Sequence, residues 1–229
     1  MIDSPLSLDI LFSIGPVPIS SAVVTTWGLM LLLTGGSWLC TRNLRAQPTR
    51  MQALLELVVS VVAGQVRETM DDEPDPYLPL IGTLFLFILC ANWSSLIPGV
   101  EPPTAHLETD AALALIVFGA TIWFGVRKLG ARGYLRSFTR PVLLLAPLNV
   151  IESFTRIFSL LVRLFGNVMS GVFVVAVVLD LSGLLVPIPL MALDMLTGAV
   201  QAYIFSALAL VFIGSAISEA ASEAKKETP

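Results

Sequence analysis

Charged and metal-binding side chains are scarce in this chain, which argues against a soluble globular domain. Only 13% of the 229 residues are charged, and there is a single histidine. The two cysteines, Cys40 and Cys90, lie inside apolar segments, which favours neither a disulfide framework nor a metal site. The first 20 residues carry Asp3 and Asp9 but no basic residue, unlike the positive region of a cleaved signal peptide. We therefore expect the first apolar helix to be retained.

Apolar sequence is abundant instead. Hydrophobic residues make up 55% of the chain, and the mean hydropathy is +0.85. Several apolar runs reach the roughly 20 residues that a helix needs to cross a membrane, and none shows the ten-residue alternation of a membrane β-barrel. We predict an all-α integral membrane protein with about five transmembrane helices and one interfacial amphipathic helix, whose last two helices form a long tilted hairpin.

The first predicted span covers residues 21–41, and Arg42 and Arg45 follow it at once. By the positive-inside rule its C-terminal end is cytoplasmic, so residues 1–20 form an external N-terminus. Residues 49–68 place apolar side chains at helical spacing between polar ones, so this segment can lie along the membrane surface. A second membrane span is the alternative there, because charged residues are few.

Two further spans, residues 77–97 and 111–126, enclose a loop with acidic residues and no lysine or arginine, as an external loop would have. A cytoplasmic loop is predicted after the second of these spans because five basic residues follow it, namely Arg127, Lys128, Arg132, Arg136 and Arg140. The remaining apolar sequence predicts a hairpin over residues 145–217 and a cytoplasmic tail at 218–229.

The first helix of this hairpin is unusually long. No proline occurs between Pro147 and Pro187, so one helix can run from about residue 148 to 181, a length of roughly 50 Å. Such a helix must tilt steeply, kink or extend beyond the bilayer. A steep tilt suits a protein that lies against a partner, and a kink at Gly166 or Gly171 is the alternative.

Polar side chains form a stripe along the long helix: Asn149, Glu152, Arg156, Ser159, Arg163, Asn167 and Ser170. A polar stripe in lipid needs polar neighbours. The last helix offers Asp194 and Gln201, which lie seven residues apart and share a face. The small residues Gly198, Ala199 and Ala202 beside them permit the close approach of another helix.

Arg163 is the most informative of these residues, because a permanent guanidinium in an apolar helix costs roughly 3 to 17 kcal/mol. Snorkelling to the headgroups is the alternative, although Arg156 is better placed for it. Glu152 is either functional or an interfacial residue paired with Arg156 at the i+4 position. Asp194 has apolar neighbours, which favours a functional role, whereas we expect His106 to be a solvent-exposed loop residue.

Residues 163–167, with the sequence Arg-Leu-Phe-Gly-Asn, strongly resemble the signature of subunit a of the F-type ATP synthases. Residues 201–205, Gln-Ala-Tyr-Ile-Phe, are similar to the second signature of that family on the last helix. The resemblance continues through residues 24–27, 84–89 and 103–105, so it covers nearly the whole chain in order.

The resemblance implies a stator subunit that faces a rotating ring of c subunits, each with an ion-binding carboxylate in the membrane. Arg163 would favour the ionised form of an approaching carboxylate, release its H⁺ or Na⁺, and block a continuous leak. The implied partners are the c ring, the b subunits of the peripheral stalk and membrane lipid, with no nucleic acid. No cofactor, metal or catalytic residue is implied, and the expected location is the bacterial inner membrane.

Two offset half-channels would complete this mechanism. The resemblance implies that five residues carry ion translocation: Arg163, Asn167, Gln201, Asp194 and Glu152. Of these, Glu152 would belong to the cytoplasmic route and the polar residues near the arginine to the outer route. Three loop residues would lie at the outer mouth: His106, Glu108 and Asp110.

The chain departs from the family pattern at three positions. Val172 stands where many relatives carry a glutamate or a histidine, which leaves Asp194 to carry that function alone. His106 stands where an aspartate is common, and Ile157 replaces a usual proline.

Two other classes of protein are alternatives. A self-contained secondary transporter would show internal repeats and interrupted helices around a midplane site, and the chain has no convincing repeat. An intramembrane enzyme would need catalytic residues, yet the chain has neither a Gly-x-Ser-x-Gly nor a His-Glu-x-x-His motif.

Overall fold

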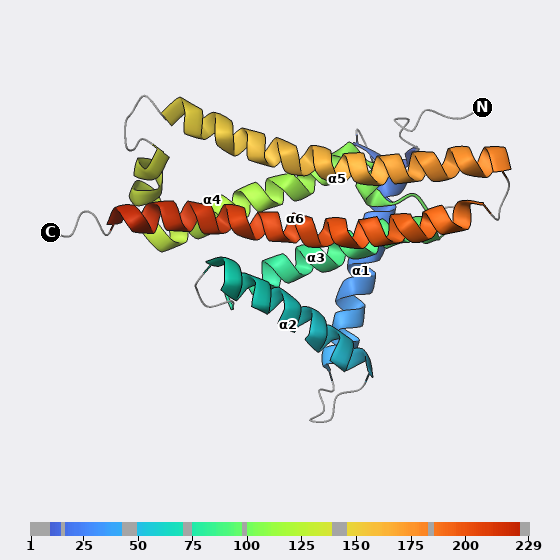
Figure 1. Cartoon of the computed structure of the whole chain (residues 1–229), viewed down its shortest axis with the longest axis horizontal. Coiled ribbons are helices and arrows are strands. Elements are labelled where there is room, and N and C mark those ends of the chain that lie inside the picture. Colours follow the sequence, from blue (N-terminus) through green and yellow to red (C-terminus); the bar gives the residue numbers. More distant parts are fainter. Residues whose placement is uncertain are drawn as a thin grey trace.

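The computed structural model describes residues 10–14, 17–42, 50–70, 75–97, 100–138, 146–182 and 186–224. Within these ranges the chain is almost entirely helical (Figure 1). The six α-helices are α1 (Ser21–Thr41), α2 (Arg50–Met70), α3 (Leu78–Trp93), α4 (Leu107–Phe138), α5 (Ala146–Ser182) and α6 (Pro187–Ala224). Two short 3-10 helices, η1 (Ser94–Leu96) and η2 (Pro103–Ala105), lie between α3 and α4.

Five of the described helices are long and apolar enough to cross a membrane, which confirms the predicted fold class. These candidate spans are Ser21–Thr41, Leu78–Leu96, Leu107–Lys128, Ile151–Leu181 and Pro187–Ile217. Helix α2 is not among them. Its Val62 and Val66 are buried against the helical core, whereas Glu56, Arg67 and Glu68 are exposed. This distribution favours an interfacial helix over a second span.

Helices α5 and α6 form the predicted long hairpin. They run side by side along the longest axis of the molecule, and α1 crosses behind them at a steep angle (Figure 1). Helix α5 is continuous because no proline interrupts it between Pro147 and its end at Ser182. Helix α6 begins at Pro187, where the missing N–H of a proline costs no helical hydrogen bond.

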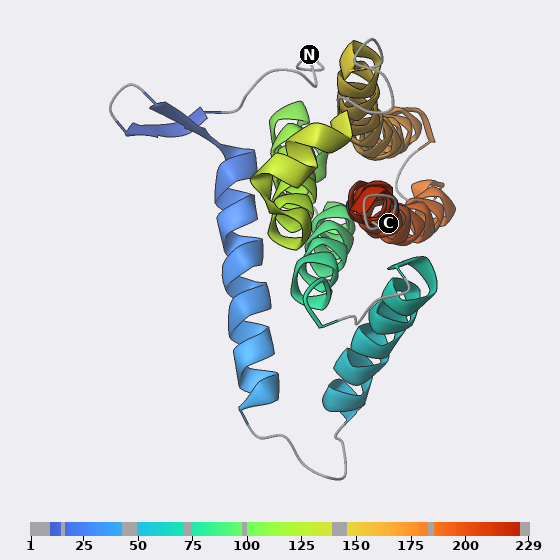
Figure 2. The same cartoon turned by 90° about the vertical axis from the view of Figure 1, so that its left-hand side faces the viewer.

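The core lies where α6 meets α3, α4 and α5. Figure 2 shows α3 and α4 between α1 on one side and the α5–α6 pair on the other. The inner face of α6 supplies five fully buried apolar side chains, Ala202, Phe205, Ala209, Leu210 and Ile213. Ile81 and Ile88 of α3 and Leu164 of α5 pack into the same cluster and are also fully buried. This core orients α5, so it decides which of its side chains point outward.

The third predicted span, residues 111–126, is part of a longer helix. Helix α4 begins at Leu107 rather than at 111 and continues to Phe138, so most of the expected basic loop is helical. The direction changes at Gly130, where φ is 75°, a value that glycine adopts without steric cost. Beyond this kink the ring of Tyr134 packs on Gly125, where a Cβ would lie 2.6 Å from the Tyr134 Cε2.

The N-terminal segment also differs from the prediction, which contained no strand. Residues Ile10–Ile14 (β1) and Val17–Ser20 (β2) pair as an antiparallel hairpin directly before α1. The segment is rich in β-branched residues, which favour extended backbone.

Candidate functional site

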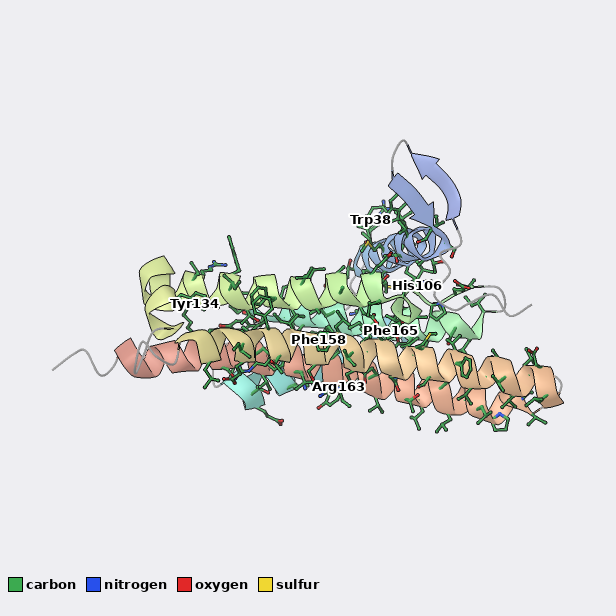
Figure 3. The ribbon with its side chains drawn as sticks, turned by 90° about the horizontal axis from the view of Figure 1, so that it is seen from above. Trp38, His106, Tyr134, Phe158, Arg163 and Phe165 are labelled. Atoms are coloured by element: carbon green, nitrogen blue, oxygen red, sulfur yellow. The ribbon has the colours of Figure 1, made fainter. Side chains whose placement is uncertain are left out.

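Arg163 lies on the outward face of α5. The helix buries Leu160, Leu164 and Val168, which are spaced four residues apart, and this leaves Arg163 exposed. In Figure 3 Arg163 lies on the side of the α5–α6 pair that faces away from α4 and α1. Within the described part of the chain, Arg163 forms no hydrogen bond or ion pair. The guanidinium is therefore available to a group on another molecule.

Arg156, two turns earlier on the same helix, has partners within the chain. Its Nη2 donates a hydrogen bond to Oε1 of Glu152 at the i−4 position. The guanidinium carbon also lies 5.7 Å from the ring centroid of Phe212 on α6, a cation–π arrangement. The pairing that was the alternative interpretation of Glu152 is therefore present, and it compensates both charges locally.

Asn167 and Ser170 continue the polar stripe beyond the arginine. Asn167 is partly buried, and its backbone carbonyl accepts a hydrogen bond of 2.9 Å from the Ser170 hydroxyl. Val172 is partly buried against the apolar core. The ionisable group in this region comes from α6.

That group is Asp194, whose carboxylate lies directly against the backbone of α5 at Gly171. A Cβ on Gly171 would overlap Oδ1 of Asp194 and would lie 2.8 Å from its Cγ. The absence of a side chain at Gly171 therefore creates the space that the carboxylate occupies. The position next to Val172 thus receives a carboxylate from the opposite helix.

Gln201 lies two turns further along α6 and is buried, with 6% of its surface exposed. Its Nε2 is buried too and forms no hydrogen bond with any described residue. An amide N–H without a partner is costly in an apolar interior. This N–H is therefore available to donate a hydrogen bond to a water molecule or a polar ligand. Nearby, the Ser206 hydroxyl donates to the carbonyl of Ala202 at 2.9 Å.

The predicted close approach at the small residues of α6 is confirmed, and the approaching helix is α3. A Cβ on Gly198 would lie 3.0 Å from the Cβ of Asn92. The Asn92 Nδ2 donates a hydrogen bond of 2.9 Å to the Gly198 carbonyl, and its Oδ1 accepts one of 2.7 Å from Thr104 in η2. Next to it, the Trp93 Nε1 donates to the Met195 carbonyl at 3.1 Å.

These hydrogen bonds from Asn92 and Trp93 to α6 were not predicted from the sequence. Asn92 is a polar residue inside an apolar run, and polar side chains within membrane helices commonly bond to a neighbouring helix. That signal identifies Asn92 as a contact residue. Its partner is a backbone carbonyl 106 residues away, which no local pattern reveals.

The residues expected at the outer mouth have different environments. His106 was expected to be exposed, but only 12% of its side chain is accessible, and its Nε2 lies 3.4 Å from Oε2 of Glu101. Asp110 was expected in a loop, but α4 begins earlier and buries it completely. Acidic residues suit this first turn, because a helix N-terminus attracts negative charge. Only Glu108 of the three is exposed.

Asp110 is unusual because both of its carboxylate oxygens are buried and neither accepts a hydrogen bond from a described residue. Burying an ionised carboxylate without a partner is strongly unfavourable, so burial favours the neutral form or a partner from outside the described residues. In the described part of the chain, no three histidine, cysteine, aspartate or glutamate residues are grouped as a metal site would need.

The site therefore joins some predicted residues and separates others. Asp194 and the Arg163 helix meet at Gly171, whereas no hydrogen bond or ion pair among the described residues links Arg163 to Asp194 or to Gln201. The described residues include five helices that are long and apolar enough to cross a membrane, and Arg163, Asp194 and Gln201 lie within two of them. These features define a multi-pass membrane protein with charged and polar groups in its spanning helices.

Comparison with known proteins identifies the family. A family model described as ATP synthase A chain matches residues 23–214. The ATP synthase subunit a 2 of Bradyrhizobium sp. (strain BTAi1) is 53% identical over 221 residues, which cover 96% of this chain and 99% of the relative. The ATP synthase subunit a 2 of Acaryochloris marina is 47% identical over 204 residues, covering 88% of this chain and 87% of that protein. The ATP synthase subunit a 1 of Chlorobaculum parvum is 46% identical over 209 residues, covering 90% and 92%. The chain belongs to the ATP synthase subunit a family.

Proposed function

We propose that this chain is the ion-translocating subunit of the membrane sector of an F-type ATP synthase, without catalytic chemistry of its own. The observation that carries the proposal is the contrast between two arginines on α5. Arg156 is paired with Glu152, whereas Arg163 is exposed and has no hydrogen bond or ion pair among the described residues. A charge left unpaired in a membrane helix needs a counter-charge from outside the chain.

The counter-charge in this proposal is the membrane carboxylate of a c subunit in the rotating ring. When a carboxylate approaches Arg163, the guanidinium favours its ionised form, so the bound ion is released. The same fixed charge repels a cation that would otherwise pass directly between the two aqueous routes. Ion flow is then coupled to rotation of the ring.

The two routes use the other predicted residues. Glu152 contributes to the cytoplasmic route, while Asn167, Asp194 and Gln201 line the outer route. His106, Glu108 and Asp110 belong to the outer entrance, where the buried Asp110 carboxylate, which accepts no hydrogen bond from a described residue, suits the passage of H⁺ or Na⁺. The unpaired Nε2 of Gln201 supports the same route, because a hydrated path supplies the acceptor that it lacks.

The proposal also covers assembly and orientation. The b subunits of the peripheral stalk hold the chain against the ring. The chain lies in a bacterial inner membrane with its N-terminus outside and its C-terminus in the cytoplasm, because basic residues follow the first span and the apolar part of α4.

Replacing Arg163 tests the proposal. In membrane vesicles that contain the assembled synthase, Arg163→Ala is expected to abolish ATP-driven ion pumping, while the c ring and b subunits still copurify with the chain. Arg127→Ala, on an exposed residue just before the kink of α4 at Gly130, is the control. Normal coupled pumping by the Arg163→Ala complex would refute the proposed function.

A further inference from the structure

Two hydrogen bonds between α3 and α6, a buried one from Asn92 and an exposed one from Trp93, lie next to Asp194 and have no place in the ion route described above. Helix α6 accepts them at the carbonyls of Met195 and Gly198. Met195 directly follows Asp194, and Gly198 lies one helical turn beyond it. The two bonds therefore hold the turn of α6 that carries the carboxylate.

Both acceptors already belong to the backbone of a helix. A helical carbonyl accepts one N–H from four residues ahead and retains a second lone pair, so an external donor can bond without breaking the helix. Asn92 is buried and Gly198 has no side chain, so the amide reaches the carbonyl directly. This contact fixes both the depth and the rotation of α6 relative to α3.

A second hydrogen bond orients the side chain of Asn92. Its Oδ1 accepts a hydrogen bond from Thr104, which is fully buried in η2. The side-chain amide therefore has a single orientation, with its N–H₂ group directed at α6. A chain of hydrogen bonds runs from Thr104 in η2 through Asn92 in α3 to Gly198 in α6. One helical turn before Gly198, Asp194 of α6 contacts Gly171 on α5.

We propose that Asn92, oriented by Thr104 and assisted by Trp93, is a positioning residue that holds the Asp194 carboxylate against Gly171 for ion transfer on the outer route. This inference rests on the proposed function for its ion-transfer step. The geometric part, that Asn92 sets the register between α3 and α6, does not depend on it.

The transport test uses assembled synthase in proteoliposomes and measures two quantities, the half-saturating concentration of the transported ion on the outer side and the maximum rate. Thr104→Val keeps the shape of the side chain but removes the hydroxyl, and Trp93→Phe removes the N–H donor. Each is expected to raise the half-saturating concentration about threefold to tenfold, the net value of one typical hydrogen bond, with little change in maximum rate per complex.

Two further variants separate positioning from folding. Thr104→Ser retains the hydroxyl and is expected to restore the wild-type half-saturating concentration. Thr121→Val, whose hydroxyl bonds only within α4, is the matched control. An unchanged half-saturating concentration in both Thr104→Val and Trp93→Phe would overturn the proposal, as would a loss of assembled complex as their only effect.

A distance measurement tests the register independently of ion transport. Spin labels on Thr83 of α3 and Val211 of α6, both exposed, report the alignment of the two helices. Asn92→Leu is expected to shift or broaden the distance distribution, and an unchanged distribution would overturn the positioning role. If Arg163→Ala pumped normally, the proposed function would fail while this structural result still stood.

Discussion

Arg156 and Arg163 lie two turns apart on the same helix, yet their surroundings differ. Arg156 bonds to Glu152 and lies over the ring of Phe212. Arg163 is exposed and has no such contact with the described residues. Among the described residues one guanidinium is compensated and the other is not, which is the difference that the proposed external partner of Arg163 would require.

The same contrast appears on the last helix. Asp194 is partly exposed and lies where α6 meets α5, whereas the neighbouring backbone of α6 is fixed by Asn92 and Trp93. Arg163 and Asp194 form no ion pair among the described residues, whereas the hydrogen bonds of Asn92 and Trp93 hold the backbone of α6. Preorganised surroundings around an available charge are what an electrostatic site requires.

The largest effect is expected when the two arginines are compared directly by substitution with lysine. Arg163→Lys should reduce coupled ATP synthesis at least about tenfold, because an ammonium can lose its proton in an apolar setting and lacks the planar fork of donors. Arg156→Lys should retain most of the activity, since lysine can still pair with Glu152. The rate of ATP synthesis in energised vesicles measures the effect of each variant. Equal losses in the two variants would remove the distinction between the arginines.

A smaller effect is expected from filling the space at Gly171. A methyl group there overlaps the end of the Asp194 side chain, which can rotate away, so the helices should stay packed while the carboxylate is displaced. Gly171→Ala should slow ion uptake from the outer side nearly as much as Asp194→Asn does. Gly119→Ala on α4, where a Cβ meets no atom within 4 Å, is the control. Wild-type uptake in Gly171→Ala would show that the position of the carboxylate is unimportant.

The smallest effect is expected when Glu152, the partner of Arg156, is replaced. Glu152→Gln removes the charge that compensates Arg156, but both side chains are substantially accessible, at 56% and 36%. Exposed ion pairs at i and i+4 contribute little, so the assembled complex should keep its thermal stability, and release on the cytoplasmic side should slow less than about threefold. Complete loss of pumping would instead place Glu152 among the essential groups.

The sequence predicted those features that depend on local chemistry. The extent of α5 follows from the absence of proline, and the start of α6 follows from Pro187. The first helix also ends where the apolar run ends, at Thr41. These features are set by the residues of a single segment, so a single segment reveals them.

Features that depend on contacts between distant segments were not predicted. The burial of Asp110 and His106 depends on how the start of α4 packs, and the bond from Asn92 to Gly198 joins residues from two helices. The extension of α4 was missed because Gly130 and the basic residues around it are also typical of a loop. Helical periodicity gives the face of a residue but not its neighbour.

The central claim is that the partner of Arg163 lies on another protein chain. Photo-crosslinking in the assembled synthase tests it most directly, with a photoreactive amino acid at Ser159, one turn before Arg163 on the same exposed face. The product should join this chain to a c subunit, close to the carboxylate of its membrane helix. The same amino acid at Leu160, which is 1% exposed, should react within the chain. Crosslinks from Ser159 only to lipid or to this chain itself would contradict the account.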